Sequence, residues 1–278
     1  MKLPRAILVA GLLLIGTAAF AFQREFRDLG GERPIPLPPD YKQPAEFVFG
    51  RLMYPDGGFG GFGGFGRRRG GGWRESAPTM GWGNDYPAAD RHLMVALRRL
   101  TRIDARSVEQ PVNLEDGDDV FNWPFLFAGR TTQIDLSDEM TVKLREYLNR
   151  GGFLICDDMW GPEEHQAVFQ LVERLYPDRD LTELGNNDSV MHTVFNLNDR
   201  YQIIGQWGIR NGFYPLNGAS DPHWRGVFDE KNRMMMAVWL NTDTGDSWEW
   251  ADVPEYPEHY SALGFRIVIN HIIYDMTH

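Results

Sequence analysis

Strand-like and helix-like patterns alternate along the middle of this sequence, and that alternation limits the folds it can adopt. Residues 47–54, 121–129 and 153–156 are apolar or aromatic runs typical of buried strands. Between them, Leu93, Leu97 and Leu100 have the spacing of one helix face, and Ser137 precedes a second amphipathic segment as its N-cap. Successive strand–helix units predict an α/β domain, with an open sheet sandwiched by helices.

The run at residues 153–156 is wholly apolar, as in a parallel strand that is buried on both faces. Pro162 then predicts the start of a third helix. The C-terminal half differs, because residues 190–197 and 233–240 have strand-like composition and are separated by loops rich in Gly, Asn, Asp and Pro. These segments predict an antiparallel extension of the sheet. Ser261 is expected to cap a terminal helix with a broad apolar stripe.

The first 21 residues have the composition of a signal peptide. Lys2 and Arg5 form a basic start, residues 6–18 are apolar, and Ala19 and Ala21 flank Phe20 as a small-x-small cleavage signal. We therefore expect Sec-type export to the periplasm or the extracellular space, with cleavage after Ala21 and no stable membrane span afterwards. The alternative is an uncleaved membrane anchor, since the apolar run approaches the length of a spanning helix.

Two segments have compositions that oppose regular structure. Residues 22–45 are rich in Pro, Gly and charge and predict a linker, so that the α/β domain covers residues 46–278. Residues 57–72 repeat Gly-Gly-Phe and include three arginines, which predicts a disordered insertion. A phosphate-binding loop is the alternative for this insertion, but no G-x-x-x-x-G-K-[ST] pattern is present.

Charge and cysteine content narrow the possible partners. The net charge is −11, and removal of Lys2 and Arg5 with the signal peptide leaves 26 basic against 39 acidic residues, a charge near −13. Such a chain repels phosphate backbones, so we expect no nucleic-acid partner. The single cysteine, Cys156, cannot form an intramolecular disulfide, so the domain must be held together by its own core.

Candidate chemistry lies where the buried run at residues 153–156 ends. Asp157 and Asp158 follow that run directly, at the edge where open α/β sheets bind ligands. We consider both as catalytic carboxylates that hold and deprotonate a water. A divalent metal ion is a possible cofactor, with Asp158, His192 and His223 as ligands. The structural alternative makes Asp158 a helix cap and leaves the histidines bonded to loop carbonyls.

Ligand-binding residues are expected at Trp160 and in two further segments, residues 211–226 and 246–260, that combine aromatic and polar groups. Trp160, His223, Trp224 and Arg225 offer ring faces beside hydrogen-bonding groups, as suits a carbohydrate or another polar small molecule. Residues 246–260 form an acidic, aromatic stretch that is expected to be a loop covering such a site or contacting a partner protein of the cell envelope.

The sequence also resembles a known group of proteins. The run LSDEMTVKLREYLNRGGFLICDDMWG is similar to the stretch of class I glutamine amidotransferase-like domains that leads into the nucleophile turn. Over residues 46–278 the chain resembles the domain of unknown function 4159 family, through the motifs FVFGRLMY, DYPAADRHL, FNWPFLF, GGFLICDDMWG, DPHWRG and GFRIVINHIIYDMTH. The resemblance implies a flavodoxin-like sheet and no known reaction.

One departure from the amidotransferase pattern bears on function. Those enzymes place a cysteine in a G-x-C-x-G turn, whereas Cys156 lies inside the apolar run and the two aspartates occupy the turn. A reactive thiolate needs an exposed, electropositive setting. We therefore expect a ligand-binding or interaction domain that is not an amidotransferase. The alternative is a hydrolase, with or without a metal ion, acting on a carbohydrate or related polar substrate.

Overall fold

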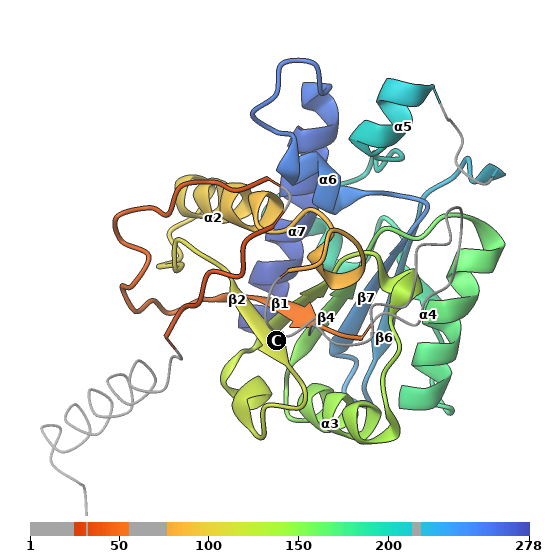
Figure 1. The fold of residues 1–278 in the computed structure, drawn as a ribbon. Coiled ribbons are helices and arrows are strands. Elements are labelled where there is room, and N and C mark those ends of the chain that lie inside the picture. Colours follow the sequence, from red (N-terminus) through yellow and green to blue (C-terminus); the bar gives the residue numbers. More distant parts are fainter. Residues whose placement is uncertain (1–24, 32, 56–76, 213–217) are drawn as a thin grey trace, which may run out of the picture.

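The computed structural model describes residues 25–31, 33–55, 77–212 and 218–278. They form a mixed sheet in the order β2-β1-β3-β4-β7-β6-β5 (Figure 1). The strands are β1 (Phe49–Met53), β2 (Gln110–Asn113), β3 (Phe125–Ala128), β4 (Phe153–Cys156), β5 (Thr182–Glu183), β6 (His223–Phe228) and β7 (Met234–Leu240). The first four and β7 pair in parallel, and β6 and β5 continue the sheet antiparallel. The predicted α/β class and antiparallel extension are confirmed.

Helices cover both faces of the sheet. They are α2 (Ala88–Leu100), α3 (Asp138–Asn149), α4 (Gly161–Leu175), α5 (Gln206–Asn211), α6 (Thr244–Glu249) and α7 (Glu258–Thr277), with short 3-10 turns η1 (Gly81–Gly83), η2 (Asp119–Asn122), η3 (Thr131–Gln133) and η4 (Ser189–His192). In Figure 1, α2 and α7 lie on one face and α3 and α4 on the other. Ser137 caps α3 as predicted, since its hydroxyl accepts a hydrogen bond from the backbone N–H of Met140.

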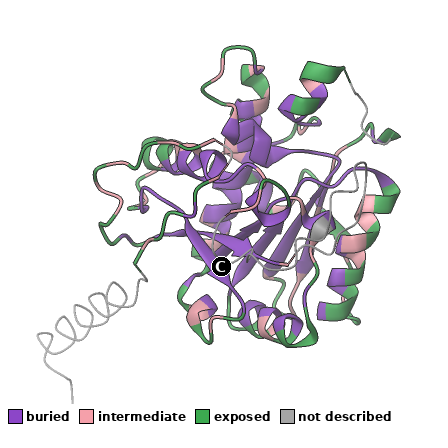
Figure 2. Cartoon of the chain, in the orientation of Figure 1, coloured by how far each residue is buried: buried purple, intermediate pink, exposed green. Residues whose placement is uncertain are grey.

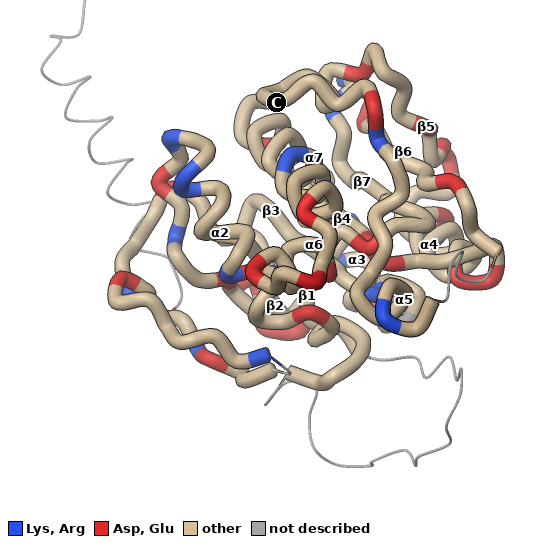
Figure 3. The backbone as a smooth tube through the Cα atoms, turned by 90° about the horizontal axis from the view of Figure 1, so that it is seen from above, with Lys and Arg blue, Asp and Glu red and all other residues tan. Residues whose placement is uncertain are grey.

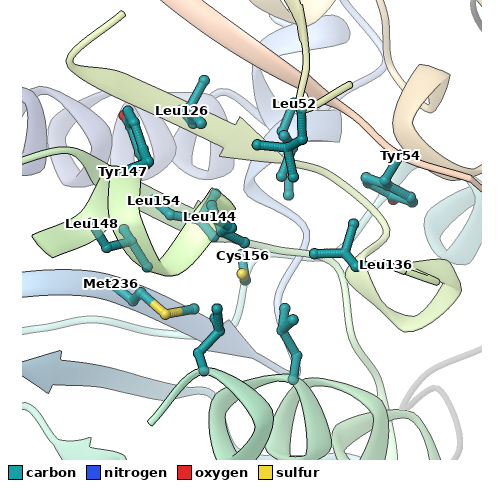
Figure 4. Close-up of a cluster of buried hydrophobic side chains, with 14 of the residues drawn as sticks. Leu52, Tyr54, Leu126, Leu136, Leu144, Tyr147, Leu148, Leu154, Cys156 and Met236 are labelled. Atoms are coloured by element: carbon teal, nitrogen blue, oxygen red, sulfur yellow. The ribbon is translucent and has the colours of Figure 1, made fainter. Parts of the chain in front are cut away.

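Strand β4 contributes to both layers of the core. Phe153 and Ile155 face the cluster formed with α2 and α7, whereas Leu154 and Cys156 face the cluster formed with α3 and α4. All four side chains are fully buried, as Figure 2 shows for the whole central sheet. Figure 4 shows the Cys156 sulfur among the apolar side chains of the second cluster. The wholly apolar composition of this strand therefore follows from its two covered faces.

Several predicted elements or boundaries were wrong. Residues 121–122 of the strand predicted at 121–129 belong to η2, and β3 begins only at Phe125. Residues 190–197 do not form a strand, because Asn270 of α7 bonds the backbone of Val194 and Phe195, leaving no need for a strand partner. Residues 223–225 were expected in a loop but belong to β6. Helix α7 begins at Glu258, so Ser261 lies inside it rather than capping it.

Residues 25–31 and 33–45 contain no helix or strand, but they lie against the domain. The Arg33 guanidinium is 3.0 Å from Asp252, and Arg91 of α2 donates to the Ile35 carbonyl over 2.5 Å. The predicted signal peptide and the glycine-rich insertion at residues 57–72 fall outside the described residues. Within the described part of the chain, no helix has both the length and the apolar character needed to span a bilayer.

Candidate functional site

Polar residues follow the parallel strands at one edge of the sheet. They include Tyr54 after β1, Arg130 after β3, Asp157 and Asp158 after β4, and Asn241 after β7. The chain leaves β1 for β2 on one side and reaches β3 on the other, so the strand order reverses between β1 and β3. Open α/β sheets bind ligands beyond such a reversal. Figure 3 looks onto this edge and shows acidic positions gathered around α6.

Asp157 is fully buried, and only one of its two oxygens has a partner. Its Oδ2 accepts hydrogen bonds from the Thr244 hydroxyl at 2.5 Å and from the Gly245 backbone N–H at 2.9 Å. Its Oδ1 is buried without a hydrogen-bond partner. Burial raises the pKa of this carboxyl to about 7, against the opposing effect of the Thr244 hydrogen bond. Asp157 therefore has a free acceptor and a proton that it loses near neutral pH.

Asp158 has the opposite surroundings. Arg130 donates to both carboxylate oxygens over 3.3 Å, and the Trp160 indole N–H donates to Oδ1 over 2.7 Å. The backbone of Asp158 is left-handed, with φ of 60°. Arg130 also lies 3.5 Å from Glu164 of α4. The charge of Asp158 is the main cause of the raised pKa of Arg130. The Asp158 carboxylate is therefore held as a structural ion pair rather than presented to a ligand.

Three further acidic residues approach one another beside Asp157, and none of them was predicted as a site residue. Asp85, Asp246 and Glu249 each place one carboxylate oxygen within 4.8 Å of the others. Asp246 and Glu249 are three residues apart on α6 and so lie on the same side of the helix. Asp85 comes from the segment before α2, with a left-handed backbone at φ 62°.

The Asp85 carboxyl has an unused oxygen directed at this group. Its Oδ1 accepts a hydrogen bond from the Asn84 amide at 2.7 Å, whereas Oδ2 is buried without a partner. Burial, followed by the charges of Asp246 and Glu249, raises the Asp85 pKa well above its usual range. Burial also raises the pKa of Asp246 to about 6. Both carboxyls thus pay a large desolvation cost when they ionise.

Among the described residues, the cluster has more carboxyls than neighbouring guanidiniums. Six carboxyls influence one another here and each is at least nine-tenths buried: Asp85, Asp157, Asp158, Asp243, Asp246 and Glu249. Arg130 pairs with Asp158, Arg51 forms a buried ion pair with Asp90, and Arg33 donates to the Glu249 carbonyl and pairs with Asp252. Buried carboxylates in excess of their cations must bind protons or a metal ion. An all-oxygen donor set suits Mg²⁺, Mn²⁺ or Ca²⁺.

Two glycines allow this close approach. A Cβ atom on Gly245 would collide with Oδ2 of Asp85 and would contact Oδ2 of Asp157 at 3.7 Å. A Cβ atom on Gly205 would collide with the carboxylates of Asp243 and Asp246. Because Gly205 and Gly245 have no side chains, the carboxylate oxygens can approach the backbone at these two positions.

A sequence signal for these residues exists, although it is weak. Asp243, Asp246 and Glu249 recur at intervals of three in DTGDSWE, which puts acidic groups on one side of a helix. The Asp243 side chain also caps α6, accepting from the Asp246 N–H over 3.1 Å. A loop was predicted for residues 246–260, which include Asp246 and Glu249, whereas Thr244–Glu249 form α6. Asp85 has no such signal, since its role depends on tertiary contact with α6.

The structure does not bring the three predicted metal ligands together. Asp158 faces Arg130, whereas both ring nitrogens of His192 on η4 interact with Asn186 and Asn196. His223 on β6 lies 3.3 Å from the Glu183 carboxylate. Among the described residues, the one group of side chains spaced to coordinate a metal ion is instead the acidic trio of Asp85, Asp246 and Glu249.

The structure does not bring the predicted ligand-binding residues together either. On β6, Trp224 is buried and packs against Trp239 at 5.8 Å, while Arg225 points to the other face and pairs with Glu183 at 2.9 Å. Trp160 is buried and holds Asp158. Their roles as ligand contacts stay predictions. Trp160 and Trp224 have the burial expected of core residues.

Comparison with known proteins identifies one family. A family model described as a domain of unknown function (DUF4159) matches residues 75–276. The matched region contains all six carboxyls of the acidic cluster. No curated protein matches the sequence at a significant level.

Proposed function

The chain belongs to the DUF4159 family, and we propose that it is an exported binding domain whose acidic cluster holds a divalent, oxygen-preferring cation. Two observations carry the proposal: one carboxylate oxygen of Asp85 lies within 4.8 Å of carboxylate oxygens of Asp246 and Glu249, and the Oδ2 of Asp85 is buried without a partner. A cation bound there would replace the protons that the cluster otherwise needs. The donors are carboxylate oxygens, which favours Mg²⁺, Mn²⁺ or Ca²⁺ over Zn²⁺.

A flavodoxin-like, class I amidotransferase-like fold is part of this proposal. It is supported by the order of the five parallel strands, which corresponds to 2-1-3-4-5 in chain order. The left-handed Asp158 at the turn from β4 to α4 is consistent with a sharp turn like those that present nucleophiles in α/β enzymes. The chemistry differs, because the thiol of Cys156 is buried and burial raises its pKa to about 12.

Export is proposed from the basic start, apolar run and small-x-small site of residues 1–21. A polar small molecule, a carbohydrate or an envelope protein is proposed as a further partner, and the acidic character of the chain opposes nucleic acid. Mass spectrometry of protein recovered from the producing cells tests export. A mature chain that still begins at Met1 would overturn it.

The cation is tested on purified protein stripped with EDTA. Calorimetric titration with MgCl₂, MnCl₂ and CaCl₂ should show one ion bound per chain for at least one of the three. Asp85→Asn should weaken that binding more than about tenfold, because it removes the carboxylate charge directed at the ion. Asparagine suits this position because it tolerates the left-handed backbone of Asp85.

Asp180→Asn is the matched control. Asp180 is exposed and remote from the cluster in sequence, so the same loss of charge there should leave ion binding within about twofold. Circular dichroism of both variants checks the fold. If no ion binds, or if the Asp85 and Asp180 variants bind equally well, the cation-binding function is wrong.

A metal-assisted hydrolase is the second candidate. It is favoured by Asp157, whose unpartnered Oδ1 and pKa of about 7 suit a general base that accepts a proton from water. Against it, the cluster is deeply buried, which suits an ion better than a large substrate. Chromogenic glycosides and esters, assayed with each cation, separate the candidates. Turnover that disappears in Asp157→Asn would establish the hydrolase in place of a simple binding domain.

A further inference from the structure

A groove on the surface is a second candidate binding site, and it lies beside residues 200–202, shortly before α5. It is a groove of about 590 Å³ whose lining includes Arg200, Tyr201, Gln202, Asp221, His259 and Tyr260. These residues come from three separate parts of the chain: the stretch before α5, the stretch before β6 and the first turn of α7. The groove therefore joins two segments, around residues 221–225 and 246–260, that the sequence analysis associated with recognition.

Gln202, which lines the groove, has a buried side-chain acceptor without a partner. The Gln202 amide nitrogen donates to the carbonyls of Ala219 at 2.9 Å and Asn241 at 2.8 Å, which fixes the orientation of the amide. Its oxygen, Oε1, is then left without a hydrogen bond, although the side chain is only 6% exposed. A buried acceptor without a partner is costly in a folded protein and is satisfied when a donor from a ligand reaches it.

A buried donor lies two residues away. The terminal nitrogens of Arg200 donate to Asn186 and to the backbone carbonyls of Leu184 and Leu197. Its Nε–H has no partner. These three bonds use three of the five N–H groups of the guanidinium, and the Nε–H is a donor that remains for a ligand.

Aromatic rings form one wall of the groove. Tyr201 is 38% exposed, and its hydroxyl donates to the His259 carbonyl over 2.6 Å. Its ring centroid lies 5.6 Å from that of His259 and 6.2 Å from that of Tyr260. The ring is thus held in place by its neighbours while part of it stays in contact with solvent, as in sites that use a preorganised aromatic surface.

From this arrangement we infer that the groove binds a neutral carbohydrate. A sugar hydroxyl can both donate and accept, so adjacent hydroxyls match the unpartnered Gln202 Oε1 and Arg200 Nε–H. The apolar face of the sugar ring would lie against Tyr201. Asp221 can accept a hydrogen bond from a further hydroxyl, and its negative charge offsets the positive charge of Arg200, which suits a neutral ligand. The groove and the acidic cluster are separate sites, so this inference does not depend on the cation.

The test uses cellotetraose, maltotetraose, mannotetraose and chitotetraose, titrated into purified protein by calorimetry up to about 5 mM, a range that reaches weak affinities. At least one of these neutral saccharides should bind. Tyr201→Ala should weaken that binding more than about tenfold, and Tyr201→Phe, which keeps the ring, should stay within about threefold of wild type. Trp207→Ala, at an exposed aromatic residue outside the groove, is the matched control and should not change affinity.

Asp85→Asn separates this inference from the proposed cation site. That variant should lose the ion but keep saccharide affinity, so each proposal can fail alone. The carbohydrate inference is overturned if no neutral saccharide binds, if only sulfated or uronic saccharides bind, or if Tyr201→Ala binds as tightly as wild type. Thermal unfolding of each variant checks that weaker binding is not caused by loss of the fold.

Discussion

Asp157 and Asp158 are neighbours in the chain, yet their carboxyls have different tasks. Side chains of successive residues after a strand point in different directions. Asp157 turns toward α6, where it meets the Thr244 hydroxyl and the Gly245 N–H. Asp158 turns toward α4 and is neutralised by Arg130. Only Asp157 keeps an unpartnered oxygen, so it is the member of the pair that can still take part in binding or proton transfer.

Cys156 should be inert in the folded protein. Its side chain is completely buried, and burial raises the pKa of the thiol to about 12, so almost no thiolate forms near pH 8. Ellman's reagent at pH 8 should therefore label no thiol in native protein. It should label one per chain after denaturation in guanidinium chloride, which serves as the control. Rapid labelling of native protein would contradict the buried position and reopen cysteine chemistry.

Strand β4 packs against helices on both faces of the sheet, so shortening one of its side chains should lower stability strongly. Leu154 is fully buried against α3 and α4, so Leu154→Ala should lower the free energy of unfolding by about 2–5 kcal/mol. Val142→Ala on α3 is the control, because Val142 is 58% exposed and should change stability by less than about 0.5 kcal/mol. Chemical denaturation measures both. Equal effects would mean that β4 is not central to the core.

Elements with strong local patterns were predictable from the sequence. The apolar run of β4 and the Ser137 cap of α3 each depend on residues close together in the chain, and both were predicted correctly. Strand β2 was missed, because its sequence QPVN has little strand character of its own. Strand β6 was missed because alternating residues in HWRGVF resemble a polar, aromatic loop. Both strands are fixed by neighbouring strands rather than by local preference.

The candidate site was predictable in part, for the same reason. The edge of the sheet and Asp157 followed from the position of the acids after a buried strand. The partners of Asp157 did not, because Asp85 and Asp246 are more than 70 residues away on either side. No local pattern records which distant loops meet. The histidines that the sequence analysis joined to Asp158 lie with other partners for that reason.

At the scale of the whole molecule, stability should depend on both pH and the cation. The pKa values of Asp246 and Asp157 are raised to about 6 and about 7, from an ordinary value of 3.8. Between pH 3.8 and 7 these two carboxyls therefore bind more protons in the folded chain than in the unfolded chain, so the stability they contribute should fall as pH rises through this window. His271, whose burial lowers its pKa to about 4, opposes part of this fall below pH 6.5. Asp275, whose burial also raises its pKa to about 7, adds to the fall.

A saturating cation should reduce this fall, because it binds the ionised cluster of the folded state. The measurement is the midpoint of thermal unfolding at several pH values from 5 to 8, with EDTA or with the ion that binds. In Asp85→Asn the two curves should coincide, whereas in Asp180→Asn they should differ as in wild type. A midpoint that rises with pH in EDTA would contradict the raised pKa values.

The contact between Asp85 and α6 brings together two segments that are far apart in the sequence. About 160 residues separate Asp85 from Asp246, and most of the sheet lies between them. An ion shared by these carboxylates would cross-link the two ends of that long loop, as a disulfide does in chains with enough cysteines. With a single cysteine, this protein has no covalent means of doing so. Release of the ion would then be the first step by which this side of the molecule opens.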